Sequence, residues 1–477
     1  MASERVSNGV EETWHPARLI PVAGIRGQEE QERRATSALL AVMGVVPDFG
    51  RALLGDVAAP KGQIRTYAEV QLRNSDGKVS IPDGAIVVER GARRWSALVE
   101  VKTGSAGLKG EQVGRYLDMA REHGFDALIT ISNEITPGPA HLPVPVDRRK
   151  LRRVAAYHLS WWRIMTEAIL QHRHRGVSDP EQAWILGELI AYLDHERSGA
   201  GGFQDMGPNW VHVRESARHG TLRASDKETS EIADRWMQFM DYIALGLSQD
   251  LGTEVTPLRS RKQTPSERRA TLIEDLALNG WLSGGVRVPD AIAPVEIRAD
   301  LKARQVTTSV GFEAPRTGRP LPRINWLLRQ LRDAPTSLRV EVSFANTRET
   351  TSLLLAEALE YPQRLLSPSD SKREPRLFTV ALTRRMGQKS GKLRGSFVGD
   401  TREQVIHFYG EIVQNLKPWQ AKAPQLREPI TAEVPEAAQS EPPPFSATVE
   451  PDEREIGEAP LPPEPPRPVA PQESRDL

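Results

Sequence analysis

The spacing of apolar residues along the first 200 positions changes from a helical period to a strand period and back. Ala35, Leu39 and Met43 share one face of a helix, so a helix is predicted over 28–43 and a shorter one after Pro47-Asp48. Alternating segments between turn residues predict a meander of three strands, over 64–72, 79–89 and 93–102, with turns at 74–77 and at Gly91. A helix over 108–123 and strands over 125–132 and 152–159 follow, giving the order αβββαβ with one strand–helix unit appended.

A second unit is predicted after a Gly-rich break at 198–202. A helix that begins at Asp179-Pro180 and runs to about 195 precedes the break. Beyond it, Ser225 and Glu228 form a capping-box pattern ahead of a long helix. The apolar stripe of that helix consists of Ile232, Trp236, Phe239, Ile243, Leu247 and Leu251. Strands over 280–312, 338–344 and 377–382 and helices over 323–332 and 401–414 complete a second α+β domain.

The end of the chain has a different composition from the rest. Residues 423–477 contain fourteen prolines, and their twelve acidic residues against four arginines give a net charge of −8. Such a segment buries too little apolar surface to offset its ordering entropy, so a disordered Pro-rich acidic tail is predicted. Solubilising the chain and docking onto an unknown protein partner are both compatible with this composition. The predicted division is therefore an N-terminal arm at 1–27, domains at 28–200 and 203–422, and the tail.

Composition also excludes several kinds of site. The chain has no cysteine, which excludes disulfides, thiolate zinc sites and cysteine nucleophiles. No apolar run approaches the roughly 20 residues of a membrane span, and the first twelve residues lack an apolar signal region. We therefore expect a cytoplasmic protein with no membrane partner. Because the whole chain is neutral, residues 1–422 carry +8, which weakly favours a polyanionic partner.

The predicted chemistry lies on the hairpin formed by the second and third strands. Asp83 follows Pro82, and Glu100 and Lys102 stand near the end of the next strand. If the hairpin turns at Gly91, Asp83 lies opposite Val99 or, with an offset of one residue, Glu100. Side chains alternate along a strand, so Glu100 and Lys102 project together, away from the apolar layer. The hairpin thus predicts two facing carboxylates with a lysine beside them.

Facing carboxylates repel each other unless a cation lies between them. Hard oxygen ligands suit Mg²⁺, with Mn²⁺ as the alternative ion. A lysine next to such a metal can orient or deprotonate an attacking water molecule.

This arrangement resembles the PD-(D/E)XK nuclease superfamily, with its restriction-endonuclease-like αβββαβ core in the α/β class. The resemblance covers about 28–132 and is carried by Pro82-Asp83 and by the run from Glu100 to Lys102. It implies that Asp83, Glu100 and the Val101 carbonyl bind the metal and that Lys102 positions the water.

Two further parts of the family pattern are recognisable. Gln112 and Tyr116 lie four residues apart on the predicted helix and resemble the QxxxY motif of one branch of the superfamily, where these groups orient the substrate strand and the lysine. The family also places a glutamate on the first helix to complete the metal shell. Glu29, Glu30 and Glu32 compete for this role, and we choose Glu32 because it shares the apolar face.

Other candidates have plainer explanations. His172-Arg173-His174 is typical of a solvated basic cluster, Trp161-Trp162 of core residues, and Glu69 of an exposed strand position. Pro289-Asp290 with Glu296 and Arg298 mimics the motif by coincidence. Two basic series could follow a phosphate backbone or form salt bridges: Arg259, Arg261, Lys262, Arg268 and Arg269, and Arg323, Arg329 and Arg332 with Trp326.

The sequence thus predicts a Mg²⁺-dependent nuclease that cleaves a nucleic acid, with DNA as the expected partner. The second domain would position substrate, form a homo-oligomer or bind a partner. The alternatives are a catalytically silent nucleic-acid-binding or assembly protein with the same fold, and a nuclease directed at RNA.

Overall fold

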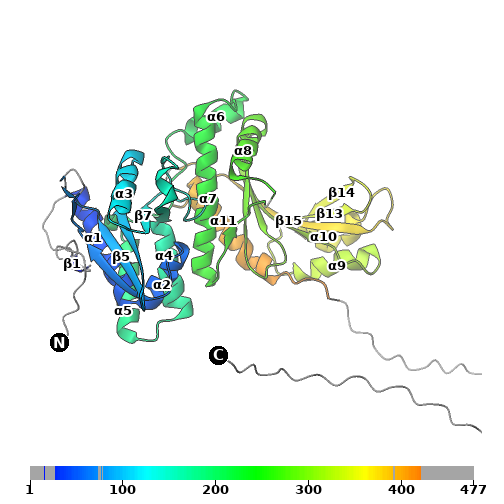
Figure 1. Cartoon of the computed structure of the whole chain (residues 1–477). Helices are drawn as coiled ribbons and strands as arrows, with labels where there is room; N and C mark the ends of the chain where they lie inside the picture. Colours follow the sequence, from blue (N-terminus) through cyan, green and yellow to red (C-terminus); the bar gives the residue numbers. More distant parts are fainter. Residues whose placement is uncertain are drawn as a thin grey trace, which may run out of the picture. The chain divides into compact units, whose positions relative to one another are not determined.

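The computed structural model describes residues 15–16, 27–73, 77, 79–260, 262–389, 391 and 393–420. Within this part the chain is a mixed α/β protein with a six-stranded sheet, a seven-stranded sheet and a two-stranded ribbon (Figure 1). The described residues up to Trp419 belong to one compact unit. The predicted N-terminal arm, the turn at 74–76 and the predicted disordered tail lie almost wholly outside the described residues.

The first sheet has the strand order β1-β2-β5-β6-β7-β8. Its first half is antiparallel, and β6, β7 and β8 run parallel to one another. The strands are β1 (His15–Pro16), β2 (Gln63–Ala68), β5 (Gly84–Arg90), β6 (Arg93–Val101), β7 (Ala127–Ser132) and β8 (Ala155–Ser160). The predicted meander of three strands is therefore present as β2, β5 and β6.

Two of the predicted strands are shorter than the pattern indicates. The strand expected over 64–72 ends at Ala68 and resumes as β3 (Leu72–Arg73), with Glu69 at a left-handed φ of 55° between them. The strand expected over 79–89 is divided into β4 (Val79–Ser80) and β5, because the chain leaves the sheet around Pro82. Proline has no N–H to donate to a ladder, which explains the break. Asp83 thus precedes a strand and does not lie within one.

Helices cover both faces of this sheet. One face packs against α1 (Gln28–Val45), α2 (Pro47–Asp56), α4 (Trp161–Ile169) and α5 (Pro180–Asp194). The other face packs against α3 (Gly110–Glu122). Along β6, Val99 and Val101 are buried on the α1 side and Leu98 on the α3 side, as the predicted alternation requires. Glu100, between the two valines, therefore turns toward α3.

The second sheet is antiparallel throughout, with the order β14-β13-β15-β12-β11-β10-β9. Its strands are β9 (Thr256–Pro257), β10 (Trp281–Arg287), β11 (Val295–Asp300), β12 (Gln305–Glu313), β13 (Arg339–Phe344), β14 (Thr350–Leu354) and β15 (Pro375–Arg385). The helices of this region are α6 (Trp210–His219), α7 (Lys227–Leu251), α8 (Pro265–Asn279), α9 (Pro320–Gln330), α10 (Leu355–Glu360) and α11 (Phe397–Glu411). The predicted second α+β region is thus an antiparallel sheet with helices.

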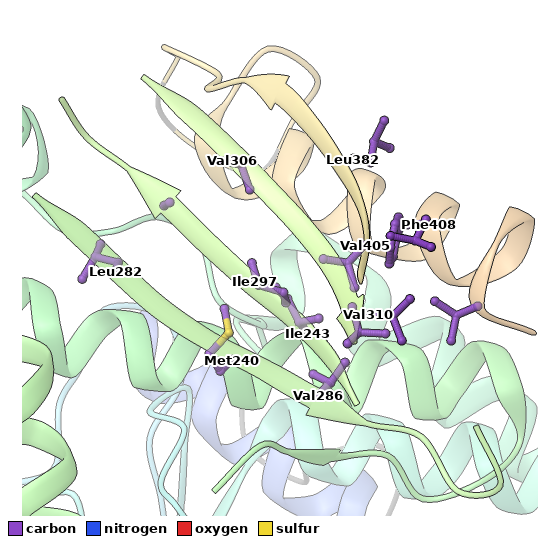
Figure 2. Close-up of a cluster of buried hydrophobic side chains, with 14 of the residues drawn as sticks. Met240, Ile243, Leu282, Val286, Ile297, Val306, Val310, Leu382, Val405 and Phe408 are labelled. Carbon is purple, nitrogen blue, oxygen red and sulfur yellow. The ribbon is translucent and has the colours of Figure 1, made fainter. Parts of the chain in front are cut away.

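The apolar stripe predicted for the long helix is its buried face. Figure 2 shows Met240 and Ile243 of α7 in one buried cluster with Leu282 and Val286 of β10. Val405 and Phe408 of α11 belong to the same buried cluster (Figure 2), and Gln404 of α11 donates to Thr308 Oγ1 on this face of the sheet at 3.3 Å. The capping prediction is wrong in detail: Asp226, not Ser225, is the N-cap residue, and its side chain makes no cap hydrogen bond.

The two sheets are connected by contacts between helices and loops. Trp162 of α4 donates from Nε1 to the Tyr242 carbonyl of α7 at 3.2 Å, and the two rings lie 4.8 Å apart. Gln249 of α7 donates to Thr166 Oγ1 of α4 at 2.8 Å. The helix pair α4–α7 therefore joins the two regions, and the predicted domain boundary at 200–203 stays a prediction.

In the described part of the chain, no single helix has both the length and the apolar content needed to span a membrane. Only α1 and α2 taken together reach that length and composition, and they are bent by 110°. Their apolar side chains belong to the core of the first sheet.

Candidate active site

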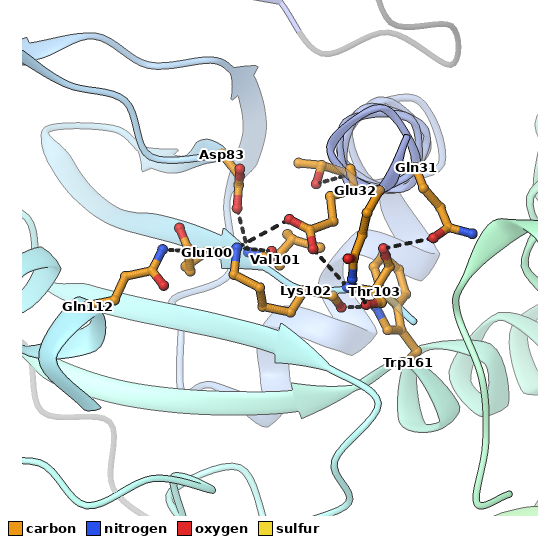
Figure 3. A network of polar contacts seen from close by, with 11 residues as sticks. Gln31, Glu32, Asp83, Glu100, Val101, Lys102, Thr103, Gln112 and Trp161 are labelled. Atoms are coloured by element: carbon orange, nitrogen blue, oxygen red, sulfur yellow. Dashed lines mark hydrogen bonds and ion pairs between the residues drawn. The ribbon is translucent and has the colours of Figure 1, made fainter. Parts of the chain in front are cut away.

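Two acidic side chains and a lysine lie together at the end of β6 (Figure 3). Glu100 is the penultimate residue of β6, and Lys102 follows the strand directly. Asp83 directly precedes β5, and the pairing of Gly84 with Val99 continues the register so that Asp83 faces Glu100. Of the two registers considered from the sequence, this is the one with the offset of one residue.

The Asp83 carboxylate is held by the main chain of the facing strand. The Val101 N–H donates to Oδ2 of Asp83 at 2.7 Å, and the Asp83 carbonyl accepts from the Glu69 N–H at 3.1 Å. Burial raises the pKa of Asp83 well above its ordinary value, and the neighbouring Glu100 raises it further. A buried acid with this environment needs a proton or a cation nearby.

Glu100 is almost fully buried, with 1% of its surface exposed. Its carboxylate accepts hydrogen bonds from the amide of Gln112 and from Lys102 Nζ, the latter at 2.9 Å. Burial raises the pKa of Glu100, while Lys102 and a hydrogen bond with Asp83 oppose the rise. The two carboxyl groups are thus close enough to interact directly, as the predicted hairpin requires.

The Lys102 ammonium group lies among three oxygen atoms. Nζ is 2.9 Å from Glu100 Oε1, 3.0 Å from the Val101 carbonyl and 3.2 Å from Glu32 Oε2. Burial opposes the charged form, but the carboxylates of Glu100, Asp83 and Glu32 outweigh it and raise the pKa of Lys102 above its ordinary value. The ammonium therefore stays charged and neutralises the acidic groups around it.

Of the three glutamates that compete on the first helix, Glu32 joins the cluster. Besides its ion pair with Lys102, its Oε1 accepts from the Thr103 N–H at 3.5 Å. Glu30 instead forms an ion pair with Arg34, one turn further along α1. The choice of Glu32 by its apolar face thus agrees with its position in the structure.

Gln112 and Tyr116 face the same cluster from α3. The amide of Gln112 donates to Glu100 (Figure 3). Burial, together with the negative charge of Glu100 and Asp83, raises the pKa of Tyr116 to about 12, and a hydrogen bond with Gln112 opposes the rise. The tyrosine therefore remains a neutral donor near the carboxylates.

The oxygen atoms of the cluster are chemically suited to a hard divalent ion. Mg²⁺ is commonly held by one or two carboxylates, with water and phosphate oxygens as its other ligands, and Asp83, Glu100 and the Val101 carbonyl provide such a set. Among the residues that the structure describes, no group of three or more His, Cys, Asp or Glu side chains is arranged as a metal site. The Lys102 ammonium lies between Glu32 and Glu100, so the magnesium site stays a prediction.

Two residues that hydrogen-bond to the main chain next to this cluster could not be predicted from the sequence. Trp161, interpreted as a core residue, is buried and also donates from Nε1 to the Lys102 carbonyl at 2.9 Å (Figure 3). Gln28 donates from its amide to the Thr103 carbonyl at 3.2 Å. These partners are 59 and 75 positions away in the chain, so no local pattern could have revealed them.

The loop after Lys102 is hydrogen-bonded to the Gly-rich break at 198–202. The Gly104 N–H donates to the Gly199 carbonyl at 2.8 Å. Asn133 connects both segments: its Nδ2 donates to the carbonyls of Gly104 and Gly199, each at 2.9 Å, and its Oδ1 accepts from the Gly201 N–H at 2.7 Å. The break at 198–202 thus lies against the candidate site.

The remaining sequence candidates lie elsewhere or are already paired. Glu69 forms an ion pair with Arg33 at 3.4 Å, and His174 hydrogen-bonds to the Gln249 carbonyl at 2.9 Å. In the basic series, Arg259 pairs with Asp241, Arg269 pairs with Asp234, and the buried Arg323 donates to the Pro375 carbonyl, whereas Arg261 lies outside the described residues. These three paired arginines fit the salt-bridge explanation better than a phosphate track.

Comparisons with known proteins find no relative of this chain. No family model matches the chain, and neither the curated proteins nor the solved structures contain a significant match.

Proposed function

We propose that this chain is a nuclease that depends on a divalent metal and hydrolyses phosphodiester bonds, with DNA as its substrate. The observation that carries the proposal is the convergence of Asp83, Glu100 and Lys102 at the end of one central strand. The element order α1, β2, β5, β6, α3, β7 supports a restriction-endonuclease-like core around them. The charge of +8 over residues 1–422 suits a polyanionic substrate.

Each residue then has a chemical role. Bound Mg²⁺ or Mn²⁺ would supply Lewis-acid stabilisation of the charge that develops on the phosphate, and Asp83, Glu100 and the Val101 carbonyl would hold it. Lys102 acts as a hydrogen-bond donor that orients the attacking water, because its raised pKa keeps it protonated. Gln112 fixes the Glu100 carboxylate by donating to it.

Cleavage assays test the proposal. Purified protein is incubated with linear duplex, circular duplex and single-stranded DNA, and with RNA, in Mg²⁺ or Mn²⁺. We expect DNA cleavage by the wild type, and a loss of about 100-fold or more for Asp83→Asn and for Lys102→Gln, because each removes a group that acts on the reacting phosphate or water.

Glu69→Gln is the matched control, since Glu69 is a nearby carboxylate that pairs with Arg33 outside the cluster. It should retain wild-type cleavage. Unchanged cleavage in Asp83→Asn and Lys102→Gln would refute the site, and preferential cleavage of RNA would refute DNA as the substrate. Binding without cleavage in any metal would favour a catalytically silent nucleic-acid-binding protein.

A further inference from the structure

A groove of about 620 Å³ lies next to the candidate active site. Its first wall is the beginning of α1, the helix that carries Glu32, and its second wall is the loop at Gly104 and Ser105, which follows Lys102. The third wall is the end of α5 and the turn after it. The residues that line it are Gly27, Gln28, Glu30, Gln31, Arg34, Gly104, Ser105, Tyr192, His195, Arg197 and Ser198.

Hydrogen bonds hold the three walls together. Gln31 of α1 donates from Nε2 to the Arg197 carbonyl at 2.6 Å and accepts from Thr103 Oγ1 at 3.5 Å. Gln28 of α1 donates to the Thr103 carbonyl at 3.2 Å. Gly199 is required here, because it has a φ of +69° and a Cβ atom at this position would lie 2.6 Å from the Gln31 side chain. The groove is therefore preformed.

The lining combines cationic groups with ring surfaces. Arg34 and Arg197 supply two guanidinium groups, and Arg197 forms no ion pair with any residue that the structure describes, whereas Arg34 is paired with Glu30. Tyr192 and His195 supply rings, and Gln28 and Ser105 add neutral donors. Cationic groups that follow a phosphate backbone, alternating with rings on which bases stack, are typical of sites for single-stranded nucleic acid.

We propose that this groove binds one strand of nucleic acid, with Arg197 at a phosphate and a base stacked on Tyr192. Its volume lies within the range of about 300–1,000 Å³ typical of small-ligand sites, which suits one or two nucleotides of a single strand. Two of its walls belong to the helix that carries Glu32 and to the loop that follows Lys102, so a strand held in the groove lies next to the elements that build the cluster. The inference rests on the proposed function for its class of substrate.

Equilibrium binding in EDTA tests the groove without cleavage. The probes are short fluorescein-labelled oligo-dT and oligo-rU single strands and a duplex of the same length, measured by fluorescence anisotropy with the full-length protein over a series of salt concentrations. Arg197→Gln should weaken binding of the single strand and reduce the slope of log affinity against log salt by about 0.7, the contribution of one phosphate contact in a single strand. Arg197→Lys should keep the slope.

A stacked base gives a second prediction of the same proposal. Tyr192→Leu should weaken single-strand binding about tenfold or more, whereas Tyr192→Phe, which keeps the ring, should bind like the wild type. Arg121→Gln is the control, since Arg121 is an exposed arginine on α3 outside the groove and pairs with Asp118. Its affinity should equal that of the wild type, and thermal unfolding of each variant verifies that it is folded.

The outcomes separate this inference from the proposed function. Unchanged affinity and salt slope in both Arg197→Gln and Tyr192→Leu, or equal competition by the duplex, would overturn the groove even if Asp83→Asn abolishes cleavage. Groove-dependent binding by a protein that cleaves nothing in Mg²⁺ or Mn²⁺ would uphold the groove and refute the nuclease. The dT and rU probes identify which type of strand the groove accepts.

Discussion

At the scale of single residues, Trp161 and Trp162 show how neighbours of the same type can have different roles. Both begin α4, but Trp161 donates to the Lys102 carbonyl at 2.9 Å, whereas Trp162 donates to the Tyr242 carbonyl at 3.2 Å. The first bond fixes the main chain of Lys102, whose ammonium group lies among the carboxylates of the cluster. The second joins α4 to α7.

Trp161→Phe should slow DNA cleavage several-fold and lower the free energy of unfolding by about 1–3 kcal/mol. An aromatic ring is kept, but the Lys102 carbonyl loses its donor, which is destabilising by about that amount, and the smaller ring leaves a cavity that adds to the loss. Cleavage rates and urea unfolding measure the two effects.

Trp162→Phe is the matched control, because it removes a comparable hydrogen bond that is made to α7 and not to the main chain of the cluster. Its unfolding free energy should fall by a similar amount while its cleavage rate stays at the wild-type level. Equal cleavage by the two variants would show that Trp161 has only a structural role.

His158 is a buried residue whose charge state is linked to stability. Its Nε2 donates to the Glu134 carbonyl at 2.8 Å, and its Nδ1 lies 3.0 Å from Thr130 Oγ1. Burial lowers the pKa of His158 to about 4, despite the bond to Glu134. The folded protein therefore keeps this ring neutral where an unfolded chain would protonate it.

The free energy of unfolding should consequently fall as the pH drops. In the unfolded chain His158 becomes protonated below the ordinary histidine pKa of about 6.5, whereas in the folded protein it stays neutral down to about pH 4. Between pH 7 and pH 5 this difference in proton binding lowers the free energy of unfolding by about 2 kcal/mol. Urea unfolding at both pH values measures the loss. His158→Gln should lose about 2 kcal/mol less over the same interval, and a pH dependence identical to that of the wild type would contradict the assignment.

The sequence indicated which residues of the cluster lie together better than it indicated the residues that support them. Asp83, Glu100 and Lys102 could be placed together because strand alternation and hairpin register are local rules. The contacts of Trp161 and Gln31 depend on the packing of distant segments, for which a single sequence has no signal.

At the scale of elements, Gly84 explains how β5 fits between its neighbours. A Cβ atom on this residue would lie 2.7 Å from the Tyr67 carbonyl of β2 and 2.5 Å from the Leu40 side chain of α1. Such distances are closer than non-bonded atoms tolerate. Because Gly84 has no side chain, the Leu40 side chain of α1 and the Tyr67 carbonyl of β2 can pack directly against the start of β5, next to Asp83.

Gly84→Ala should therefore destabilise the protein by about 1–3 kcal/mol, the usual effect of overpacking a core, and should reduce cleavage because it displaces the neighbouring Asp83. Urea unfolding and cleavage rates test this. In Gly55→Ala, a glycine of α2 with open space around its Cβ, the free energy of unfolding should instead rise by roughly 0.5–1 kcal/mol, because alanine favours helix. A neutral effect of Gly84→Ala would contradict the close packing.

Elements with a clear period were predicted well, and their interruptions were not. The helices over 28–45 and 227–251 have apolar stripes that coincide with their buried faces. The first five residues of β5, by contrast, are buried on both faces, so alternation could not show where that strand begins. Pro82 explains the break, in addition to its place in the Pro82-Asp83 motif.

At the scale of the whole molecule, charge is distributed unevenly along a chain that is neutral overall. Residues 423–477 carry −8 and the preceding residues +8. A chain that ends at Lys422 should therefore bind DNA more tightly than the full chain at low salt, because it lacks an acidic competitor.

Anisotropy titrations with and without the tail measure this difference. It should shrink as salt is raised, since the screening length falls from about 10 Å at 0.1 M to about 3 Å at 1 M. Equal affinities at every salt concentration would show that the tail does not compete for the basic surface. Neither the strand orders of the two sheets nor the α4–α7 contact could be predicted at this scale, because both depend on long-range packing.

The bonds that Asn133 makes to both sides of the Gly-rich segment limit how the chain can be dissected. A sequence-based cut at residue 200 would leave Asn133 Oδ1 without the Gly201 N–H and would release the end of the segment that holds Gly104. A fragment intended to carry the first sheet alone therefore has to extend past Gly202. Domain exchange between proteins of this architecture would likewise preserve the cluster only if the junction were placed on the α6 side of that segment.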